Sequence, residues 1–392
     1  MYLSEDIYAG IIEAGHTLEL YVPMPTRGIS KDVRREYRKR KSEVKFDGRM
    51  IVHRISIYRE GKNPLLRAIR YLIVNLAFIN KGLHAKADVI FVQSTPPTQG
   101  MMAGILKKIK KIPLVYNLQD VFPDSLVNSG LTTKGSLLWK IGRKIEDFSY
   151  NSSDRIIVIS EGFKKNLLDK KVPKDKIVII SNWVDTNLVK HIERKENKLI
   201  GELSLSLSDF IVVYAGNFGA AQGADIILRV AELLRSYSEI KFVIFGGGPY
   251  FENAVNYVKD KRLYNVTIRA LLPPNRVSEV YSLGDVALIT CKTGFGDSGM
   301  PSKTWSIMAC NTPIVASYDL DSDLDMLLNK SKFGICVKPG DENLLAMKIL
   351  DTYYSRTNVF PDRDISYLDK YASREVCVSK YVSEISKLVD LE

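Results

Sequence analysis

Short apolar runs alternate with longer amphipathic segments along most of this chain. Runs at residues 88–93, 113–118, 155–159 and 176–180 predict strands, and the segments between them have the apolar spacing of helices. After residue 208, six more runs predict strands at residues 210–215, 240–245, 265–269, 285–290, 313–317 and 334–337. Strands that alternate with helices are typical of parallel sheets covered by helices on both faces. The pattern therefore predicts an α/β fold of two Rossmann-like domains that face a cleft.

A polar, charged stretch at residues 185–208 separates the two series and is interpreted as a linker without a clear core. We place an N-terminal domain at residues 1–186 and a C-terminal domain at residues 187–372. Residues 373–392 have the spacing of a last helix, for which packing against the N-terminal domain is one option.

The N-terminal series begins on a helix, at residues 4–14, before strands at residues 17–22 and 50–57. A doubly wound domain is expected to begin on a strand, which would lie inside a parallel sheet. Without that strand, backbone groups of its neighbours would be unpaired and apolar surface would be uncovered. We therefore expect that the chain as given lacks a first strand and its loop, and that it is poorly active until they are restored.

Composition excludes several classes of protein. With 392 residues, 45% of them apolar and 26% charged, the chain is long enough for two full cores and is not a disordered polymer. Its four cysteines have no paired spacing, which argues against a disulfide framework and against a zinc site. No signal peptide and no apolar run of membrane-spanning length is visible, so we expect a cytoplasmic protein.

The net charge of +11 predicts a polyanionic partner. Residues 31–41 are a basic run, and residues 64–86 are a predicted helix with apolar side chains over much of its circumference beside arginine and lysine. The first is either a solvated face or a contact for anionic lipid, and the second is either a buried helix or one that lies in a membrane interface. Nucleic-acid binding is the least favoured interpretation, because no nucleic-acid motif accompanies the basic run.

Glycine follows three strand ends of the C-terminal series, which is where open α/β sheets bind ligands. In the third motif, at residues 294–303, Pro301 is expected to preset the first turn of a helix and Lys303 to add a cation from that turn. Backbone amides that a ligand can approach closely, a helix N-terminus and a lysine together predict a site for a phosphate or diphosphate group.

Six motifs carry a resemblance to a known family. They are LQDVFPDS at residues 118–125, IISNWVD at 179–185, YAGNFGAAQG at 214–223, FGGGP at 245–249, MPSKTWSIMACNTPIVAS at 300–317 and VKPGD at 337–341. With these motifs the chain resembles the family 4 retaining glycosyltransferases of the two-domain GT-B fold over nearly its whole length. It is particularly similar to the bacterial branch that builds cell-surface polysaccharides.

The resemblance implies transfer of a hexosyl or N-acetylhexosaminyl unit from a nucleotide-diphosphate sugar to a lipid-linked or oligosaccharide acceptor. The pathway would be capsule, exopolysaccharide or O-antigen synthesis, carried out by a peripheral protein at the inner face of the plasma membrane. Such enzymes hold the donor mainly on the C-terminal domain and the acceptor on the N-terminal side. They require no cofactor and no essential metal.

At the donor site the chain departs from the family. Asn217 and Gln222 stand where many relatives have an arginine and a lysine, so Lys303 is the substitute cation for the diphosphate. Ser298 and Ser306 replace two glutamates, the second of which usually binds the ribose hydroxyls. The donor-binding residues that the resemblance implies are Gly216, Asn217, Gly219, Gln222, Gly246, Gly248, Gly299, Met300, Pro301, Ser302 and Ser306.

On the acceptor side, Gln119 replaces a histidine that many relatives have before the aspartate corresponding to Asp120. Asp120 is expected to orient the acceptor or take its proton, although an aspartate at a strand end is also a common helix cap or loop anchor. Asp120, Gln119 and Lys303 are the expected catalytic residues.

An Asp-x-Asp pattern at residues 319–323 matches the metal-binding pattern of a different class of glycosyltransferase. Ser322 and Asp323 precede an apolar run, so we interpret this segment as a helix cap.

Two other functions stay open. A chain without its first strand is also consistent with a catalytically impaired, glycosyltransferase-like partner protein. A nucleotide-sugar epimerase of the same fold is less favoured, because the glutamate and histidine cluster expected for proton abstraction is not visible in the sequence.

Overall fold

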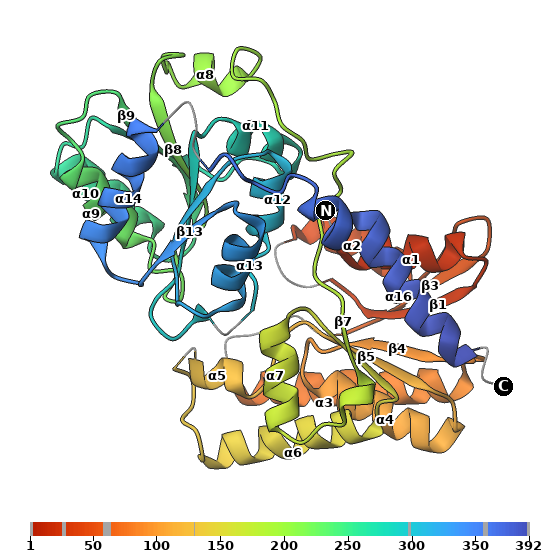
Figure 1. Cartoon of the computed structure of the whole chain (residues 1–392). Coiled ribbons are helices and arrows are strands. Elements are labelled where there is room, and N and C mark those ends of the chain that lie inside the picture. Colours follow the sequence, from red (N-terminus) through yellow and green to blue (C-terminus); the bar gives the residue numbers. More distant parts are fainter. Residues whose placement is uncertain are drawn as a thin grey trace.

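The computed structural model describes residues 3–25, 29–57, 64–128, 130–296, 299–355 and 360–389. The chain forms two α/β halves, and the last helix returns from the second half to the first (Figure 1). Among the described helices, none is both long and apolar enough to span a membrane.

The C-terminal half contains a six-stranded parallel sheet in the order β10-β9-β8-β11-β12-β13. All six predicted strands are present, with ends within two residues of the expected ones. They are β8 (Phe210–Asn217), β9 (Ile240–Gly247), β10 (Val266–Ala270), β11 (Val286–Thr290), β12 (Ile314–Ser317) and β13 (Gly334–Val337). The covering helices are α9 (Asp225–Leu233), α10 (Phe251–Asp260), η2 (Pro274–Arg276), α11 (Val277–Ser282), α12 (Lys303–Ala309), α13 (Asp323–Ser331) and α14 (Glu342–Tyr354).

This sheet has a hydrophobic core on each face. In β8, Ile211 and Val213 belong to one cluster, whereas Phe210, Val212 and Tyr214 belong to the other. Side chains of a strand alternate between the two faces, so a strand that is apolar at every position must be covered on both. The continuous apolar runs seen in the sequence therefore correspond to strands buried on both sides.

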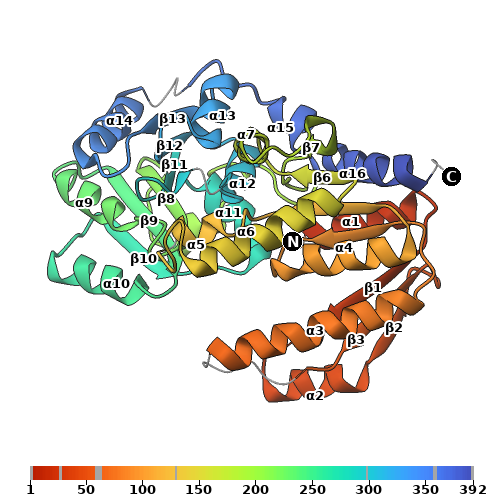
Figure 2. The same cartoon turned by 90° about the horizontal axis from the view of Figure 1, so that it is seen from below.

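The N-terminal half differs from the single parallel sheet that the sequence predicts. Its strands form a four-stranded parallel sheet, β4-β5-β6-β7, and a separate sheet, β1-β3-β2, in which β2 is antiparallel. Figure 2 shows the β1–β3 sheet and α2 on the far side of this half from the C-terminal half. The strands are β1 (Leu18–Pro23), β2 (Ser42–Lys45), β3 (Met50–Ile55), β4 (Ile90–Gln93), β5 (Leu114–Leu118), β6 (Arg155–Val158) and β7 (Ile177–Ile179). The helices are α1 (Leu3–Glu13), α2 (Lys31–Lys39), α3 (Pro64–His84), α4 (Thr98–Lys110), α5 (Asp124–Asn128), α6 (Leu137–Ser152), α7 (Glu161–Asp169) and η1 (Lys174–Lys176).

The basic run at residues 31–41 is largely helix α2. Ser30 caps it by accepting a hydrogen bond from the amide of Val33, and none of the helix residues is buried. The charged side chains of this run therefore lie on a solvated face.

The stretch at residues 185–208 is not the coreless linker that its composition indicates. It contains the short helix α8 (Lys198–Glu202), and Val189 and Leu199 are buried in a core cluster of the C-terminal half. The hydroxyl of Ser278 in α11 accepts a hydrogen bond from the amide of Lys190, at 3.2 Å. A few apolar side chains among many charged ones are enough to hold this segment on the second half.

Helix α16 (Arg374–Val389) follows the short helix α15 (Tyr367–Tyr371) and lies against α1 and the N-terminal sheet. Arg374 forms an ion pair with Asp6 of α1 at 2.9 Å, and the Trp183 indole donates to the other oxygen of the same carboxylate, also at 2.9 Å. The buried hydroxyl of Tyr381 donates to the side-chain oxygen of Asn117 in β5 at 3.0 Å. The C-terminus of the chain thereby stabilises the N-terminal half.

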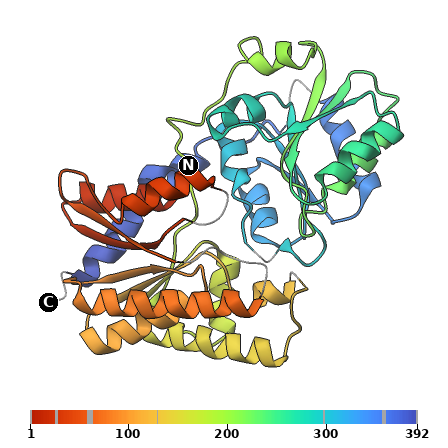
Figure 3. The same ribbon diagram turned by 180° about the vertical axis from the view of Figure 1, so that it is seen from behind.

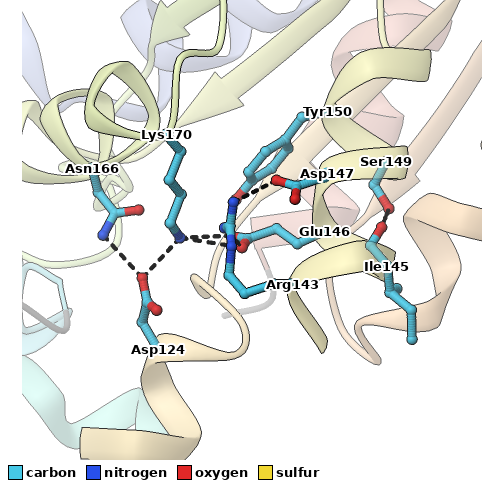
Figure 4. Close-up of polar contacts among 9 residues, drawn as sticks. All are labelled: Asp124, Arg143, Ile145, Glu146, Asp147, Ser149, Tyr150, Asn166 and Lys170. Atoms are coloured by element: carbon cyan, nitrogen blue, oxygen red, sulfur yellow. Dashed lines mark hydrogen bonds and ion pairs between the residues drawn. The ribbon is translucent and has the colours of Figure 1, made fainter. Parts of the chain in front are cut away.

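Buried charges connect α5, α6 and α7 at the edge of the N-terminal half (Figure 4). The Lys170 ammonium lies 2.9 Å from one carboxylate oxygen of Glu146 and 2.8 Å from a carboxylate oxygen of Asp124. Arg143 and the Tyr150 hydroxyl also donate to Glu146, whose side chain is only 4% exposed. Burial raises the pKa of Glu146, although the two cations oppose this effect. Lys170 thus neutralises two carboxylates on different elements.

We predict that Lys170→Met lowers the free energy of unfolding of the N-terminal half by about 3 kcal/mol. Breaking a buried ion pair typically costs about 3–5 kcal/mol because the remaining charge is left uncompensated, and here Arg143 still compensates part of it. The measurement is urea unfolding at pH 7 followed by circular dichroism.

The matched control is Lys174→Met, which removes the charge of an exposed lysine in η1. Its effect should stay within about 0.5 kcal/mol. Equal midpoints for the two variants would contradict a stabilising role for the buried cluster.

Candidate active site

Polar groups without partners gather at the carboxyl edge of the C-terminal sheet. Thr290 ends β11 and Ser317 ends β12, the two residues are register partners, and the Ser317 hydroxyl is buried without a hydrogen-bond partner in the described structure. Buried polar groups are normally paired, so an unpaired group in a native structure is often explained by a ligand or water. This edge is therefore the candidate site for ligand binding.

The most informative group at this edge is the ammonium of Lys303. Part of the residue remains accessible, but its Nζ atom is buried and has no hydrogen-bond or ion-pair partner in the described structure. Nζ lies 4.2 Å from the ring centroid of Tyr214, which attracts the cation through the face of the ring. Burial lowers the pKa of Lys303 from 10.5 to about 8. At neutral pH the site thus holds a positive charge that lacks an anion.

The first glycine motif makes room for this lysine. A Cβ atom at Gly216 would lie 2.7 Å from Lys303 Nζ, so a larger residue would push the ammonium out of its position. Helix α12 begins at Lys303 itself, two residues later than expected, so Pro301 precedes the helix and does not preset its first turn. Ser302 gives no side-chain cap, and Ser306 follows one turn after Lys303.

Asn217 and Gln222, which both belong to the first glycine motif, contact each other through their side chains. The Asn217 amide nitrogen lies 3.3 Å from the Gln222 side-chain oxygen, and a Cβ at Gly219 would contact both side chains. Gly248 has a φ of +101°, and a Cβ there would lie 1.9 Å from the Asn217 oxygen. Two glycine motifs therefore converge on one uncharged amide pair. Gly246 does not face the amide pair. A Cβ atom there would contact the rings of Phe218 and Phe251, so a glycine at this position lets these rings pack against the backbone.

The third motif contacts the opposite half of the molecule. Gly299 has a φ of +122°, its carbonyl accepts from the Tyr318 hydroxyl at 3.3 Å, and a Cβ there would meet Phe163 at 3.4 Å. Nearby, the Gly162 amide of α7 donates to Asp323 of α13 at 2.9 Å. Met300 is half-buried on the core of the C-terminal half. Residues 299–303 thus lie where the two halves approach each other, and Ser298 lies outside the described residues.

The segment at residues 319–323 caps a helix, as expected. Ser322 is the N-cap of α13 and accepts a hydrogen bond from the amide of Asp325. Asp319 accepts from the amides of Gly294 and Gly296 at 3.0 and 2.7 Å, which holds the start of the third glycine motif. The carboxylate of Asp319 therefore already has backbone amides as hydrogen-bond partners.

On the other half, Asp120 follows β5 and has an exposed carboxylate that accepts from the Ser125 hydroxyl at 3.2 Å. The surrounding protein removes enough water to raise the pKa of Asp120, and the Ser125 hydrogen bond partly offsets this. Gln119 points into the domain, where its amide donates to Asn117 at 3.0 Å. The structure therefore leaves Asp120 accessible and uses Gln119 to link β5 to its neighbours.

The sequence pattern does not single out two residues of this edge. Tyr214 supplies the ring beneath Lys303, and Lys292, just after β11, lines a cavity of about 330 Å³ together with Gly219 and Tyr250. A lysine after a strand end has no distinctive spacing. The fold places Lys292 beside Gly223 of the first motif, where an added Cβ atom would lie 3.2 Å from the Lys292 side chain. Only this tertiary contact brings the second cation to the first motif.

Comparison with known families agrees with this division into two halves. The model described as Glycosyltransferase Family 4 matches residues 5–188, and the model described as Glycosyl transferases group 1 matches residues 209–354. The chain belongs to glycosyltransferase family 4. Its two halves are the Rossmann-like domains of the GT-B fold.

Curated relatives of this glycosyltransferase are distant. WbjE of Pseudomonas aeruginosa, which is named as a glycosyltransferase, is 25% identical over 74% of this chain and 73% of its own length. WcaI of Escherichia coli K12, named for colanic acid biosynthesis, is 22% identical over 72% of this chain and 69% of its own.

Solved structures share the fold at low identity. Sucrose-phosphate synthase of Thermosynechococcus elongatus aligns with a TM-score of 0.75 at 14% identity, covering 99% of this chain and 93% of that one. Anabaena HepE in complex with UDP aligns with a TM-score of 0.70 at 13% identity, covering 95% and 100% of the two chains.

We predict that Lys303→Met raises the free energy of unfolding at pH 7 by about 1–3 kcal/mol. The folded state binds the Lys303 proton less tightly than the unfolded state, so the unfolded state holds more protons between about pH 8 and 10.5. The destabilisation is fully present below pH 8 and is lost as the pH rises to 10.5. Attraction by the Tyr214 ring reduces it, which gives the lower bound.

The measurement is the difference between the urea midpoints of the variant and the parent protein at pH 7 and at pH 10.5. Other titrating groups cancel in this difference, which should shrink towards zero at the higher pH. A variant less stable than the parent at pH 7 would mean that the ammonium already has a stabilising partner.

Proposed function

We propose that this glycosyltransferase transfers a sugar, with retention at the anomeric carbon, from a nucleotide-diphosphate sugar to a lipid-linked glycan acceptor during synthesis of a bacterial surface polysaccharide. The observation that carries the donor assignment is the buried, unpaired ammonium of Lys303, which lies against Gly216 of the first glycine motif. A diphosphate supplies the negative charge that this site lacks. The name of WcaI supports a role in polysaccharide synthesis.

The donor in this proposal is a UDP-sugar. HepE, which shares the fold, has been crystallised with UDP and with UDP-glucose. Lys303 and Lys292 would bind the diphosphate, and the Asn217–Gln222 pair would hydrogen-bond to it where relatives use charged side chains. Ser306 would contact the ribose, since its hydroxyl can both donate and accept.

During transfer, negative charge develops on the diphosphate of the departing UDP. As the bond between the anomeric carbon and the diphosphate oxygen breaks, Lys303 stabilises that oxygen from a site that excludes water, where electrostatic interactions are strong. The acceptor hydroxyl attacks the same face of the sugar, and Asp120 orients this hydroxyl or takes its proton. The raised pKa of Asp120 favours proton acceptance, because a more basic carboxylate is a better base.

A membrane-facing surface fits a lipid-linked acceptor. Helix α3 exposes Ile69, Leu72, Ile73, Leu76 and Leu83, whose side chains are 38–59% exposed. Helices α3 and α6 lie in the layer of the N-terminal half that forms the bottom of the molecule in Figure 3. In α6, Leu137, Leu138 and Ile141 are 48–75% exposed beside the exposed Lys140 and Lys144. Exposed apolar side chains among lysines are the pattern of a surface that inserts into anionic membrane interfaces.

We predict that millimolar UDP raises the melting temperature of the parent protein and not that of Lys303→Met. Binding to the folded state alone must stabilise it. In a transfer assay the variant should be about a hundredfold slower, since such a contact supplies on the order of 3 kcal/mol to the transition state.

The matched control is Lys338→Met, which removes an exposed lysine next to the edge strand β13 of the same sheet. It should keep both the UDP response and the transfer rate. Equal responses of the two variants to UDP would remove Lys303 from the site, and no response of the parent to UDP or GDP would overturn the donor assignment.

We also predict that the double variant Leu72→Gln/Leu76→Gln binds vesicles containing anionic lipid less tightly than the parent. Both leucines are more than half exposed, so folding should be unaffected. Binding by the parent should weaken as salt rises, because the basic component is screened. The measurement is co-sedimentation with vesicles.

The control variant is Leu207→Gln/Leu233→Gln, which changes two similarly exposed leucines of the C-terminal half. It should sediment like the parent. If both double variants bind equally well, the exposed face of α3 is not the membrane contact.

A further inference from the structure

Tyr214 lies where strand β8 leaves the hydrophobic core and enters the first glycine motif. Side chains of a strand alternate between the two faces of a sheet, and Tyr214 belongs to the same core cluster as Phe210 and Val212. Only 1% of Tyr214 is exposed. Unlike its two apolar neighbours on this face, it ends in a hydroxyl, and a buried hydroxyl needs a hydrogen-bond partner. Tyr214 therefore connects the packed centre of the sheet with the edge that holds the candidate site.

The ring of Tyr214 is the contact that holds the Lys303 ammonium. Nζ of Lys303 lies 4.2 Å from the ring centroid, within the range of a cation–π interaction. Among the described residues Nζ has no hydrogen-bond partner. Gly216 leaves room for this contact, because a Cβ atom there would lie 2.7 Å from Nζ and 3.1 Å from the Tyr214 oxygen. The ring thus favours the charged form of a lysine that lacks an acidic neighbour.

The surroundings of Tyr214 fix the position of its ring. Its hydroxyl donates to the backbone carbonyl of Asn217 at 3.0 Å, and the Thr290 hydroxyl, at the end of β11, supplies a further hydrogen bond to it. The Phe218 ring packs edge-on against the Tyr214 ring, with centroids 5.6 Å apart. Burial raises the pKa of Tyr214 far above its usual value, so the hydroxyl keeps its proton and remains a donor. The ring is therefore held from both ends.

The other charged groups of this edge do not replace the ring. Burial lowers the pKa of Lys303 to about 8, and among the described residues no charged side chain contributes to this shift. Lys292 follows β11 and is itself a cation, and Asp319 follows β12 with its carboxylate already bound by two backbone amides. The charge of Lys303 therefore depends on a balance between desolvation, which opposes it, and the ring, which favours it.

We propose that Tyr214 is a positioning residue for the transfer reaction, whose ring keeps the Lys303 ammonium charged and in place for the donor diphosphate. This inference rests on the proposed function, because it assigns the diphosphate to Lys303. Tyr214 acts through the lysine and is not itself a catalytic residue. Since the ring favours the charged lysine, it extends donor binding to higher pH.

Three variants separate the ring from the hydroxyl and from simple packing. Tyr214→Phe keeps the ring and removes only the hydroxyl, whereas Tyr214→Leu removes both. The matched control is Phe242→Leu, which removes a fully buried ring of the same core cluster from β9. Loss of the Tyr214 ring should lower the pKa of Lys303 by about one unit, because a desolvated cation–π contact supplies about the free energy that one pKa unit represents.

The first measurement is the affinity for UDP by calorimetry between pH 7 and pH 9.5, where the phosphate groups are already ionised. The affinity of the parent should fall as the pH rises above about 8, because the free protein loses the Lys303 proton. In Tyr214→Leu the fall should begin about one unit lower. This variant should bind UDP about tenfold more weakly than the parent at pH 8.5 and only about twofold more weakly at pH 7. Tyr214→Phe and Phe242→Leu should keep the pH profile of the parent.

A further variant keeps the packing of the site. Replacement of Tyr214 by pentafluorophenylalanine preserves an aromatic ring of nearly the same volume, but fluorination removes the negative potential of the ring face that attracts cations. Its pH profile should match that of Tyr214→Leu and not that of Tyr214→Phe. This comparison tests the ring face even if Tyr214→Leu fails to fold.

The second measurement uses no ligand, so it separates this inference from the donor assignment. It is a double-mutant cycle of urea unfolding with Tyr214→Leu and Lys303→Met. At pH 7, Tyr214→Leu should lower the urea midpoint more in the parent than in Lys303→Met, because only the parent loses the contact between ring and ammonium. At pH 10, where Lys303 is neutral in the folded parent, the two shifts should be equal. The same cycle with Phe242→Leu should show no difference at either pH.

Two results would overturn the role of Tyr214. Equal midpoint shifts in the two backgrounds at pH 7 would mean that the ring does not act on the ammonium. A pH profile of the fluorinated variant that matches Tyr214→Phe would mean that the ring only fills space. If the cycle shows the expected coupling but the parent binds neither UDP nor GDP, Tyr214 does position the lysine and the donor assignment is the part that fails.

Discussion

The strands at the centre of the C-terminal sheet are covered by side chains on both faces, and the rest of the molecule depends on this constraint. The backbone of β8 and β11 is paired within the sheet and their side chains are buried, so a ligand can be bound only beyond the strand ends. The glycine motifs, Thr290 and Ser317 all occur there. The fold concentrates polar chemistry at one edge because every other surface of these strands is used for packing.

Two lysines of this protein show how partners decide what a buried charge does. Lys170 contacts Glu146 and Asp124, so its charge is compensated and it connects helices. Lys303 has only the face of the Tyr214 ring, and burial lowers its pKa to about 8. Removing one partner of a compensated buried pair destabilises a structure, whereas an uncompensated buried charge stores free energy that an anionic ligand can release. This difference, rather than the residue type, makes Lys303 the candidate for binding an anionic ligand.

The two halves differ in how completely they satisfy the constraint of a covered parallel sheet. In the C-terminal half the six strands are continuous. In the N-terminal half the described strands form two separate sheets, and a cavity of about 770 Å³ lies between β1 and β4. Helix α16, which returns from the other half, lines this cavity and also holds Asn117 through Tyr381. The edge that leads to Asp120 therefore borders an interrupted sheet.

The sequence by itself determined the alternation of strands and helices, the carboxyl-edge position of the glycine motifs and the choice of Lys303, because each depends on local patterns of apolar residues, glycine and charge. It also placed the cap at Ser322. It could not predict that residues 185–208 pack on the second half, that α12 begins at Lys303, or that Tyr214 and Lys292 join the site. It also could not predict that Gln119 points inward. Those features depend on contacts between residues far apart in the chain, and only tertiary packing decides which side chains meet and which charges remain unpaired.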